Sequence, residues 1–289
     1  MSSLVVDTNM SALQALNDLN ATDSNMSTAI NRLSSGLQIQ NAATGPAQYV
    51  ISQALESQSN GYTTAISNAQ DGVSLIQTAS GALSQISSIL QTMDQLALTS
   101  SNGATQTATS LAANQAEFAD LQSSITEIAK TTTFGTKNLL VGKVTTTAPA
   151  GTPTTAFTGT LQVGAFDLGN QQITLSISAV TAKSLKLTSS NVSIGTATKA
   201  AAAVSSVQTA LATVDAVAST VGATQNELQA IVSNLTIGQQ NLQAASSQLV
   251  DVNMAQEMTT FSTDQILMQS GVAMLAQAQQ APSLVLKLV

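Results

Sequence analysis

The sequence predicts a mainly α fold, a long, coiled-coil-like antiparallel helical bundle built from both chain halves, with a small β-hairpin region in the middle. Three observations predict it. Two long heptad seams lie far apart in the chain, the segment between them alternates apolar and polar residues, and aromatic residues make up only 2% of the composition. Because two such seams need partners, pairing the two halves with each other is the most economical arrangement.

The first seam lies between residues 46 and 100, where apolar or small residues recur in steps of four and three over roughly seven heptads. Such a helix would extend on the order of 80 Å. Within it, Gly72 indicates either a close helix–helix approach or a local kink. The seam consists of Ile51, Leu55, Gln58, Tyr62, Ala65, Ala69, Gly72, Ile76, Ala79, Leu83, Ile86, Leu90, Met93 and Ala97.

A second helix is predicted from about Ser110 to Lys130, ending where β-branched residues and glycine follow at 131–135. The mirror seam then occupies residues 207–249, again in steps of four and three. Its members are Val207, Leu211, Val214, Ala218, Val221, Gln225, Leu228, Val232, Leu235, Gln239, Leu242 and Leu249.

The middle of the chain, residues 141–199, is rich in Thr, Gly and Pro. Apolar residues alternate with polar ones at 161–165 and at 173–179, which predicts two short strands. The turn between them is predicted at Asp167–Asn170. A calcium site using Asp167 and Asn170 is the alternative to a plain turn, but the loop lacks the ligand series of an EF-hand.

The two ends are apolar, although chain termini are usually polar and frayed. Exposed apolar ends need cover, either from each other or from neighbouring subunits, and two narrow stripes favour the second. We therefore predict an assembly interface at residues 1–35 and 250–289. Its candidate residues are Leu4, Leu13, Leu16, Ile30, Arg32, Leu33, Met254, Met258, Phe261, Leu267, Met268, Val272, Leu275 and Leu286.

Composition excludes several classes of function. The net charge is −7 and Arg32 is the sole arginine, which argues against a nucleic-acid partner. Cys and His are absent, and no phosphate loop, zinc spacing or nucleophile elbow occurs, so we expect no enzyme, cofactor or metal. The first residues do not form a Sec-type signal peptide, and no run of about 18 apolar residues predicts a membrane span.

Several motifs occur in order along the chain and resemble the terminal blocks of bacterial flagellins, the subunits of flagellar filaments. They cover the amino-terminal half and the last quarter of the sequence. The motifs are Arg32-Leu33-Ser34-Ser35-Gly36-Leu37, Asn68-Ala69-Gln70-Asp71-Gly72-Val73-Ser74, Thr131-Thr132-Thr133-Phe134-Gly135, Gln256-Glu257-Met258, Gln265-Ile266-Leu267 and Leu275-Ala276-Gln277-Ala278.

The resemblance implies an extracellular filament subunit for motility that polymerises with itself. It implies inner filament-core helices from residues 1–45 and 250–289, and an outer bundle from 46–140 and 200–249 with the β-rich insert 141–199. In this family the terminal helices are disordered in the free monomer and fold on assembly. The implied partners are the flagellar type III export apparatus and its chaperone, the filament cap and hook-associated proteins.

The resemblance also bears on innate immunity. Flagellins detected by the flagellin-sensing Toll-like receptor commonly carry basic residues at the positions of Thr92 and Asp94, whereas Leu96 and Glu117 match the family. We therefore predict weak or absent receptor recognition.

Other interpretations stay open at this stage. A hook–filament junction protein shares the terminal architecture. A type III translocator would need a long apolar hairpin, and a flagellin with an inserted protease would need a His-Glu-x-x-His motif; the sequence has neither. Arg32 is predicted either to make an intersubunit or capping contact or to be solvated. With 8% charged residues, we expect assembly to tolerate wide changes in salt and pH.

Overall fold

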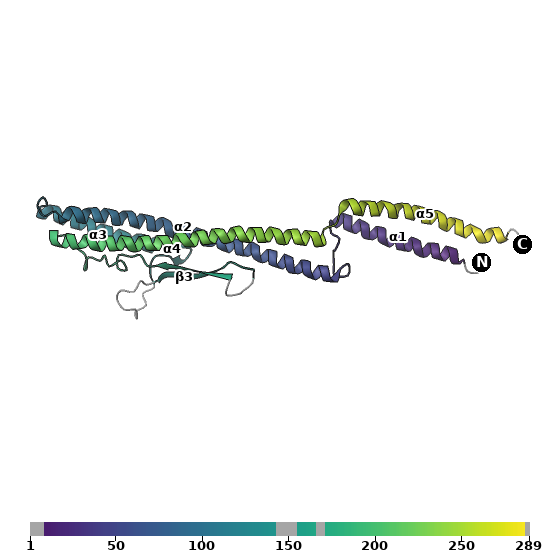
Figure 1. Ribbon diagram of the computed structural model, residues 1–289, viewed down its shortest axis with the longest axis horizontal. Helices are drawn as coiled ribbons and strands as arrows, with labels where there is room; N and C mark the ends of the chain where they lie inside the picture. Colours follow the sequence, from purple (N-terminus) through teal and green to yellow (C-terminus); the bar gives the residue numbers. More distant parts are fainter. Residues whose placement is uncertain (1–8, 143–154, 166–170, 287–289) are drawn as a thin grey trace. The chain divides into compact units, whose positions relative to one another are not determined.

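The computed structural model describes residues 9–142, 155–165 and 171–286 (Figure 1). The chain divides into two compact units, each built from both halves of the sequence. Unit 1 contains Met1–Gln58 and Gln240–Val289, and unit 2 contains Ser59–Gln239. The mainly α class, with long helices from both halves paired and small hairpins in the middle, is confirmed. The division into inner and outer filament segments stays a prediction.

Unit 2 is organised by two long helices, α2 (Pro46–Ser101) and α4 (Ala197–Val250), which also contribute residues to unit 1. They pack antiparallel, as two glycines that lie close to the other helix show. A Cβ atom added to Gly238 of α4 would lie 2.9 Å from Cε2 of Tyr62 in α2. A Cβ atom added to Gly103, just after α2, would lie 3.3 Å from Cβ of Ala197 at the start of α4. Residues with higher numbers in α2 therefore lie beside residues with lower numbers in α4, and the seams of the two chain halves pack against each other.

Burial confirms the central part of the first seam and shows a wider buried face on α4. Seam members from Ala65 to Ala97 are buried, whereas Ile51 is 49% exposed and belongs to unit 1. On α4, Ala210 and Val217 are buried beside the predicted Val214. The reason is that α4 packs in a core with more than one neighbour, which buries a wider stripe than a two-helix seam.

The third helix, α3 (Ala108–Thr131), completes this core. Its first turn is closed by a capping box, in which the Thr107 and Ser110 side chains accept from each other's backbone N–H groups. Phe118 and Ile125 on this helix are fully buried. After the helix ends, β1 (Thr133–Phe134) and β2 (Lys137–Asn138) form a small antiparallel hairpin that the sequence did not predict.

A pair of strands is present in the middle as β3 (Thr155–Gln162) and β4 (Gln172–Ser178), paired antiparallel (Figure 1). The second lies where the alternation predicted it, but the first begins six residues before the predicted 161–165 and ends at Gln162, so its position was wrong. The Asp167–Asn170 turn and its calcium alternative lie outside the described residues. The segment after β4 also enters the core, with Val180, Leu187 and Ile194 fully buried. It has no regular period, so nothing in the sequence marked it as core.

The hairpin lies against α2 at two glycines. A Cβ at Gly61 would lie 2.7 Å from Ala165 Cβ, and one at Gly72 would lie 2.4 Å from Leu161 Cδ1 and 3.2 Å from Leu228 Cδ1. Gly72 therefore marks a close approach rather than a kink, and the closer neighbour is the hairpin, with α4 second.

One helix of the described chain, α4, is long and apolar enough to span a membrane by length and composition, with a mean hydropathy of 1.3 in its most apolar 18-residue window. Polar residues interrupt α4 throughout, so it has no unbroken run of about 18 apolar residues; scattered Ala and Val residues raise its average hydropathy. Length and composition alone are weak evidence, since a helix packed in a protein core passes the same test. Several of its Val and Ala side chains pack in the core of unit 2.

Candidate assembly surface

Unit 1 is built on two helices, α1 (Met10–Ser35) and α5 (Met254–Leu286), which lie side by side and antiparallel (Figure 1). At one end the Asn9 side chain donates a 2.7 Å hydrogen bond to the carbonyl of Ala278. Further along, a Cβ at Gly271 would lie 3.0 Å from Leu19 Cδ1. These contacts fix the register of the pair.

Each helix turns one narrow stripe toward the other. The residues that are at least partly buried recur in alternating steps of three and four, as in a coiled coil. Only Ala29 and Asp264 in these stripes are buried, and the other members are partly exposed. The stripe of α1 is Ala12, Ala15, Leu19, Thr22, Met26, Ala29 and Leu33, and that of α5 is Glu257, Phe261, Asp264, Met268, Gly271, Leu275 and Ala278.

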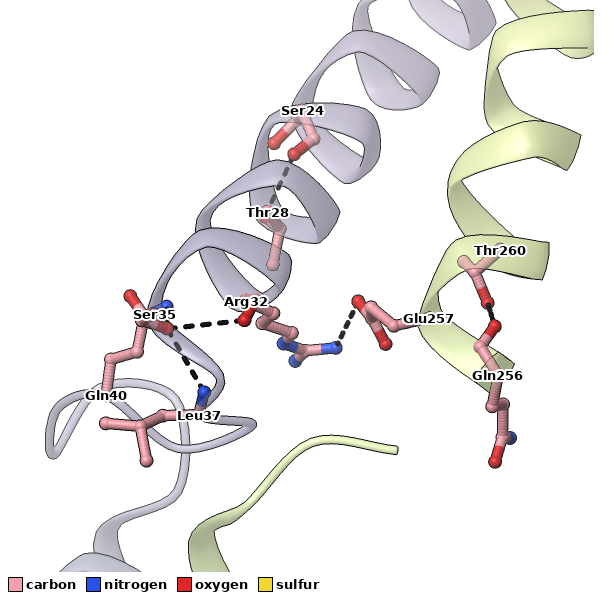
Figure 2. A network of polar contacts seen from close by, with 9 residues as sticks. All are labelled: Ser24, Thr28, Arg32, Ser35, Leu37, Gln40, Gln256, Glu257 and Thr260. Atoms are coloured by element: carbon pink, nitrogen blue, oxygen red, sulfur yellow. Dashed lines mark hydrogen bonds and ion pairs between the residues drawn. The ribbon is translucent and has the colours of Figure 1, made fainter. Parts of the chain in front are cut away.

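The Arg-Leu-Ser-Ser-Gly-Leu motif ends α1. Gly36 adopts φ 74°, the left-handed conformation of a helix C-cap, and its N–H donates to the Arg32 carbonyl at 2.8 Å. The chain then pairs with the start of the α5 segment, where Val252 N donates to the Gly36 carbonyl at 2.9 Å. Ser35 Oγ accepts from the Gln40 side chain at 2.7 Å, which holds the following turn against the helix end (Figure 2).

Arg32 points across the pair toward Glu257 of α5, at 3.5 Å between Nη1 and Oε1 (Figure 2). It is the one ion pair found among the described residues. The Glu257 side chain is only 12% exposed, so the contact lies at the seam rather than in open solvent. Arg32 is therefore not simply solvated, and Glu257 is not a solvated surface carboxylate; a contact of Arg32 with another subunit stays a prediction.

The outward faces of unit 1 are strongly apolar. Of fifteen exposed large apolar residues in the described chain, twelve lie in unit 1 and three, Leu98, Phe134 and Ile237, lie in unit 2. The twelve are Met10, Leu13, Leu16, Ile30, Val50, Ile51, Met254, Met258, Ile266, Leu267, Val272 and Met274.

Helix α5 exposes apolar residues on several sides. Met258 and Val272, four turns apart, share one flank, while Leu267 and Met274, two turns apart, share the other. Ile266, 65% exposed, lies away from the seam. A helix that is apolar all round is normally buried on all sides, so α1 alone does not cover it.

A groove of about 690 Å³ runs between α1 and the second half of α5. Its apolar lining comes from Met10, Leu19, Leu267 and Met274, beside polar Ser11, Gln14, Asp18, Thr22 and Ser270. The exposed surface of the α1·α5 pair is therefore grooved as well as partly apolar.

The predicted interface residues fall into three groups in the structure. Those exposed on the outward faces are Leu13, Leu16, Ile30, Met254, Met258, Leu267 and Val272. Those at least partly buried in the seam are Arg32, Leu33, Phe261, Met268 and Leu275. Leu4 lies outside the described residues, as does the Leu286 side chain.

The predicted interface list lacks five of the twelve exposed residues, namely Met10, Val50, Ile51, Ile266 and Met274. Met10 was recognisable, because it stands one turn before Leu13 on the same helix face. The receptor-segment residues lie in unit 2: Thr92 and Glu117 are exposed, while Leu96 is partly buried against the core. Among the described residues, no group of three or more His, Cys, Asp or Glu side chains could hold a metal ion.

Comparison with known proteins bears on both ends of the chain. The family described as the bacterial flagellin N-terminal helical region matches residues 6–145, and the bacterial flagellin C-terminal helical region matches residues 204–289. A flagellin of Halalkalibacterium halodurans is 37% identical over 286 residues, covering 99% of this chain and 100% of the relative. A flagellin of Bacillus subtilis is 36% identical, with 98% and 99% covered. A crystal structure of Bacillus cereus flagellin overlaps 58% of this chain and 88% of that chain, with a TM-score of 0.48 and 26% identity.

Proposed function

This chain belongs to the bacterial flagellin family and is a structural, non-enzymatic subunit of the extracellular flagellar filament, and we propose that its polymerisation depends chiefly on the outward apolar faces of unit 1. The observation that supports the proposal is the uneven distribution of exposed apolar residues. Twelve of fifteen lie on unit 1, and those of α5 are spread around the helix. Single scattered apolar residues need no partner, whereas twelve gathered on one unit favour cover by other copies.

The seam residues act differently from the outward ones. Phe261, Met268 and Leu275 are at least partly buried between α1 and α5, so they support assembly by pairing the two helices of one subunit. Leu13, Leu267 and Val272 point outward and would contact neighbouring copies. Burying a half-exposed leucine on assembly stabilises by about 1–1.5 kcal/mol, half of the full side-chain value.

Two leucines provide a matched test. Leu267 in unit 1 is 51% exposed and Leu98 in unit 2 is 50% exposed. We expect Leu267→Ser to raise the concentration of unassembled subunit about tenfold in seeded polymerisation, because 1.4 kcal/mol corresponds to a factor of ten. Leu98→Ser should change it less than about threefold. Equal effects from the two variants would show that unit 1 is not the main source of contact energy.

The export and cap partners follow from family membership. We propose that the chain leaves the cell through the flagellar type III apparatus with a chaperone, and that it meets the filament cap and hook-associated proteins during assembly. Deletion of the export apparatus in the source bacterium should remove this protein from the outside of the cell, while its synthesis inside the cell stays unchanged. Continued appearance outside the cell would contradict this route.

Weak recognition by the flagellin-sensing receptor remains a separate proposal. Thr92 is exposed and its hydroxyl donates to the Ser88 carbonyl at 3.2 Å, so this position offers no cation. We expect Thr92→Arg to raise signalling in receptor-expressing cells. Thr78→Arg is the matched control, because Thr78 is exposed on the same helix and makes the same kind of bond to Ser74. Wild-type signalling as potent as that of an Arg-bearing flagellin would overturn the proposal.

A further inference from the structure

The tripeptide Ser-Asn-Gly occurs twice in this chain, as Ser59-Asn60-Gly61 and as Ser101-Asn102-Gly103. These are the two places in the sequence where glycine follows asparagine. Glycine has no side chain to shield its backbone nitrogen, so this nitrogen can attack the amide of the preceding asparagine. Both asparagines are exposed, and neither side chain makes a hydrogen bond within the described part of the chain. The two sites therefore share their local chemistry and differ in the backbone around them.

Asn60 lies inside α2, where the helix holds the backbone in place. In a regular helix the Gly61 N–H donates to the carbonyl four residues earlier, so its nitrogen is engaged. Gly61 also lies tightly against the segment after β3, because an added Cβ would lie 2.7 Å from Ala165 Cβ. Ring closure at Asn60 would require α2 to open and to lose this contact. Helices packed in a core open rarely, whereas exposed loops open at almost no cost in free energy.

Asn102 lies just past the end of α2, in the turn that leads to α3. Residues 102–105 are all exposed. The Gly103 N–H donates to the Ser101 carbonyl at 3.0 Å, a bond between residues two apart that closes a tight turn and not a helix. The Asn102 carbonyl accepts from the Thr105 N–H at 3.4 Å, a long bond. An exposed turn held by such bonds opens easily, and the Gly103 nitrogen can then reach the Asn102 side chain.

We propose that Asn102 is a site of spontaneous deamidation, and that α2 protects Asn60 from the same reaction. The Gly103 backbone nitrogen loses its proton and forms a bond to Cγ of Asn102. The bond from Cγ to the side-chain nitrogen breaks, and that nitrogen takes up a proton and leaves as ammonia. The product is a succinimide ring. One water molecule then opens the ring at either carbonyl and leaves aspartate or isoaspartate at this position, so no oxidant or reductant is needed.

The reaction changes one corner of unit 2. The net charge of a modified subunit falls from −7 to −8, because a neutral amide becomes one carboxylate. The new charge follows the last turn of α2, where the helix dipole disfavours a negative group. Isoaspartate also adds one carbon to the backbone of the turn that seats Gly103 beside Ala197, the first residue of α4. Subunits that have been outside the cell for longer should therefore be more acidic at this corner.

The test uses the purified full-length chain, incubated at mildly alkaline pH, which favours loss of the Gly103 amide proton. A protease that cuts before aspartate separates the two sites, because Asp71 and Asp94 lie between them. Mass spectrometry of the peptides then measures the replacement of each asparagine amide by a hydroxyl group. The same protease cuts at an aspartate product but not at isoaspartate, which distinguishes the two. A parallel incubation in guanidinium chloride keeps both tripeptides and removes the folded backbone.

In the folded chain we expect Asn102 to deamidate at least about tenfold faster than Asn60, because the turn opens far more often than the helix. In denaturant the two rates should agree within about threefold, since only fluctuating local structure remains. Equal rates in the folded chain would overturn the proposal. So would an Asn102 that is stable when folded but reacts in denaturant, because the turn would then protect it as well as a helix does.

Two glycine variants identify the attacking nitrogen. Gly103→Ala shields it and should slow the reaction at Asn102 both in the folded chain and in denaturant, so a disturbed turn cannot explain the result. Gly81→Ala is the matched control, because an added Cβ there has nothing within 4 Å, and it should leave the rate at Asn102 unchanged. An undiminished rate in Gly103→Ala would overturn the proposal. Both asparagines belong to unit 2, so their chemistry is independent of the apolar faces of unit 1.

Discussion

The two units are built from the same kind of helix but bury it to different extents. All of the largest fully buried side chains, including Phe118, Leu90 and Ile177, belong to unit 2. There α2, α3, α4 and the β3–β4 hairpin enclose a common core. In unit 1 two helices share one narrow seam, and most of their large apolar residues remain exposed.

The difference shows how the number of packed elements sets where stability comes from. Two helices can cover one stripe of each other, whereas a third helix and a hairpin close the remaining sides. We infer that unit 2 is stable by itself and that unit 1 depends on other copies of the chain.

The core of unit 2 should respond strongly to truncation. Phe118 is fully buried, and Phe118→Ala should lower the free energy of unfolding by about 3–5 kcal/mol through lost burial and a cavity. Phe134→Ala is the matched control, since Phe134 is 37% exposed in the same unit, and it should cost no more than about 1 kcal/mol. Urea unfolding followed by circular dichroism measures both. Similar losses for the two variants would mean that unit 2 lacks the closed core described above.

The hairpin contact should produce an intermediate effect. Gly72→Ala places a methyl group 2.4 Å from Leu161 Cδ1, and overpacking of this kind costs about 1–3 kcal/mol, partly offset by the better helix propensity of alanine. Gly81 lies on the same helix with nothing within 4 Å of the added Cβ, so Gly81→Ala should stabilise by about 0.5–1 kcal/mol. Opposite signs in thermal unfolding are expected. A stabilising Gly72→Ala would show that Leu161 moves aside at no cost.

The sequence predicted unit 2 better than unit 1 for a physical reason. A buried seam repeats with the period of the helix, so Ala65 to Ala97 could be recognised directly, and alternation revealed β4 but only the last two residues of β3. The segment carrying Val180 and Ile194 packs without a period, so it could not be recognised. The wider buried face of α4 depends on how many neighbours surround it, which a single seam does not reveal.

In unit 1 the apolar ends were apparent from sequence, but their division into seam and outward faces was not. Phe261 and Leu267 are both apolar and close in sequence, yet only the register of α1 against α5 separates them. The pairing of Arg32 with Glu257 depends on the same register, because the two residues are 225 positions apart in the sequence.

The glycine that ends α1 should have a smaller effect confined to unit 1. Gly36 has φ 74° and nothing within 4 Å of an added Cβ, so Gly36→Ala costs about 1–2 kcal/mol through backbone strain alone. We expect faster hydrogen exchange at the end of α1 and an unchanged unfolding transition of unit 2. Gly36→Asn should be milder, because asparagine tolerates this conformation better. A shifted unit 2 transition would contradict the independence of the two units.

Salt concentration should have the smallest effect on stability, and we expect that effect in unit 1 and not in unit 2. The one ion pair among the described residues, Arg32–Glu257, lies in unit 1. Raising sodium chloride from about 0.05 to about 1 M shortens the screening length to roughly 3 Å, which weakens exposed charge interactions. Unit 2 unfolding should therefore change by less than about 0.5 kcal/mol. In unit 1, exchange near Arg32 should quicken slightly, and Arg32→Met should remove that dependence. A large salt effect on unit 2 would mean that charges contribute to its stability, against the interpretation that its apolar core holds it together.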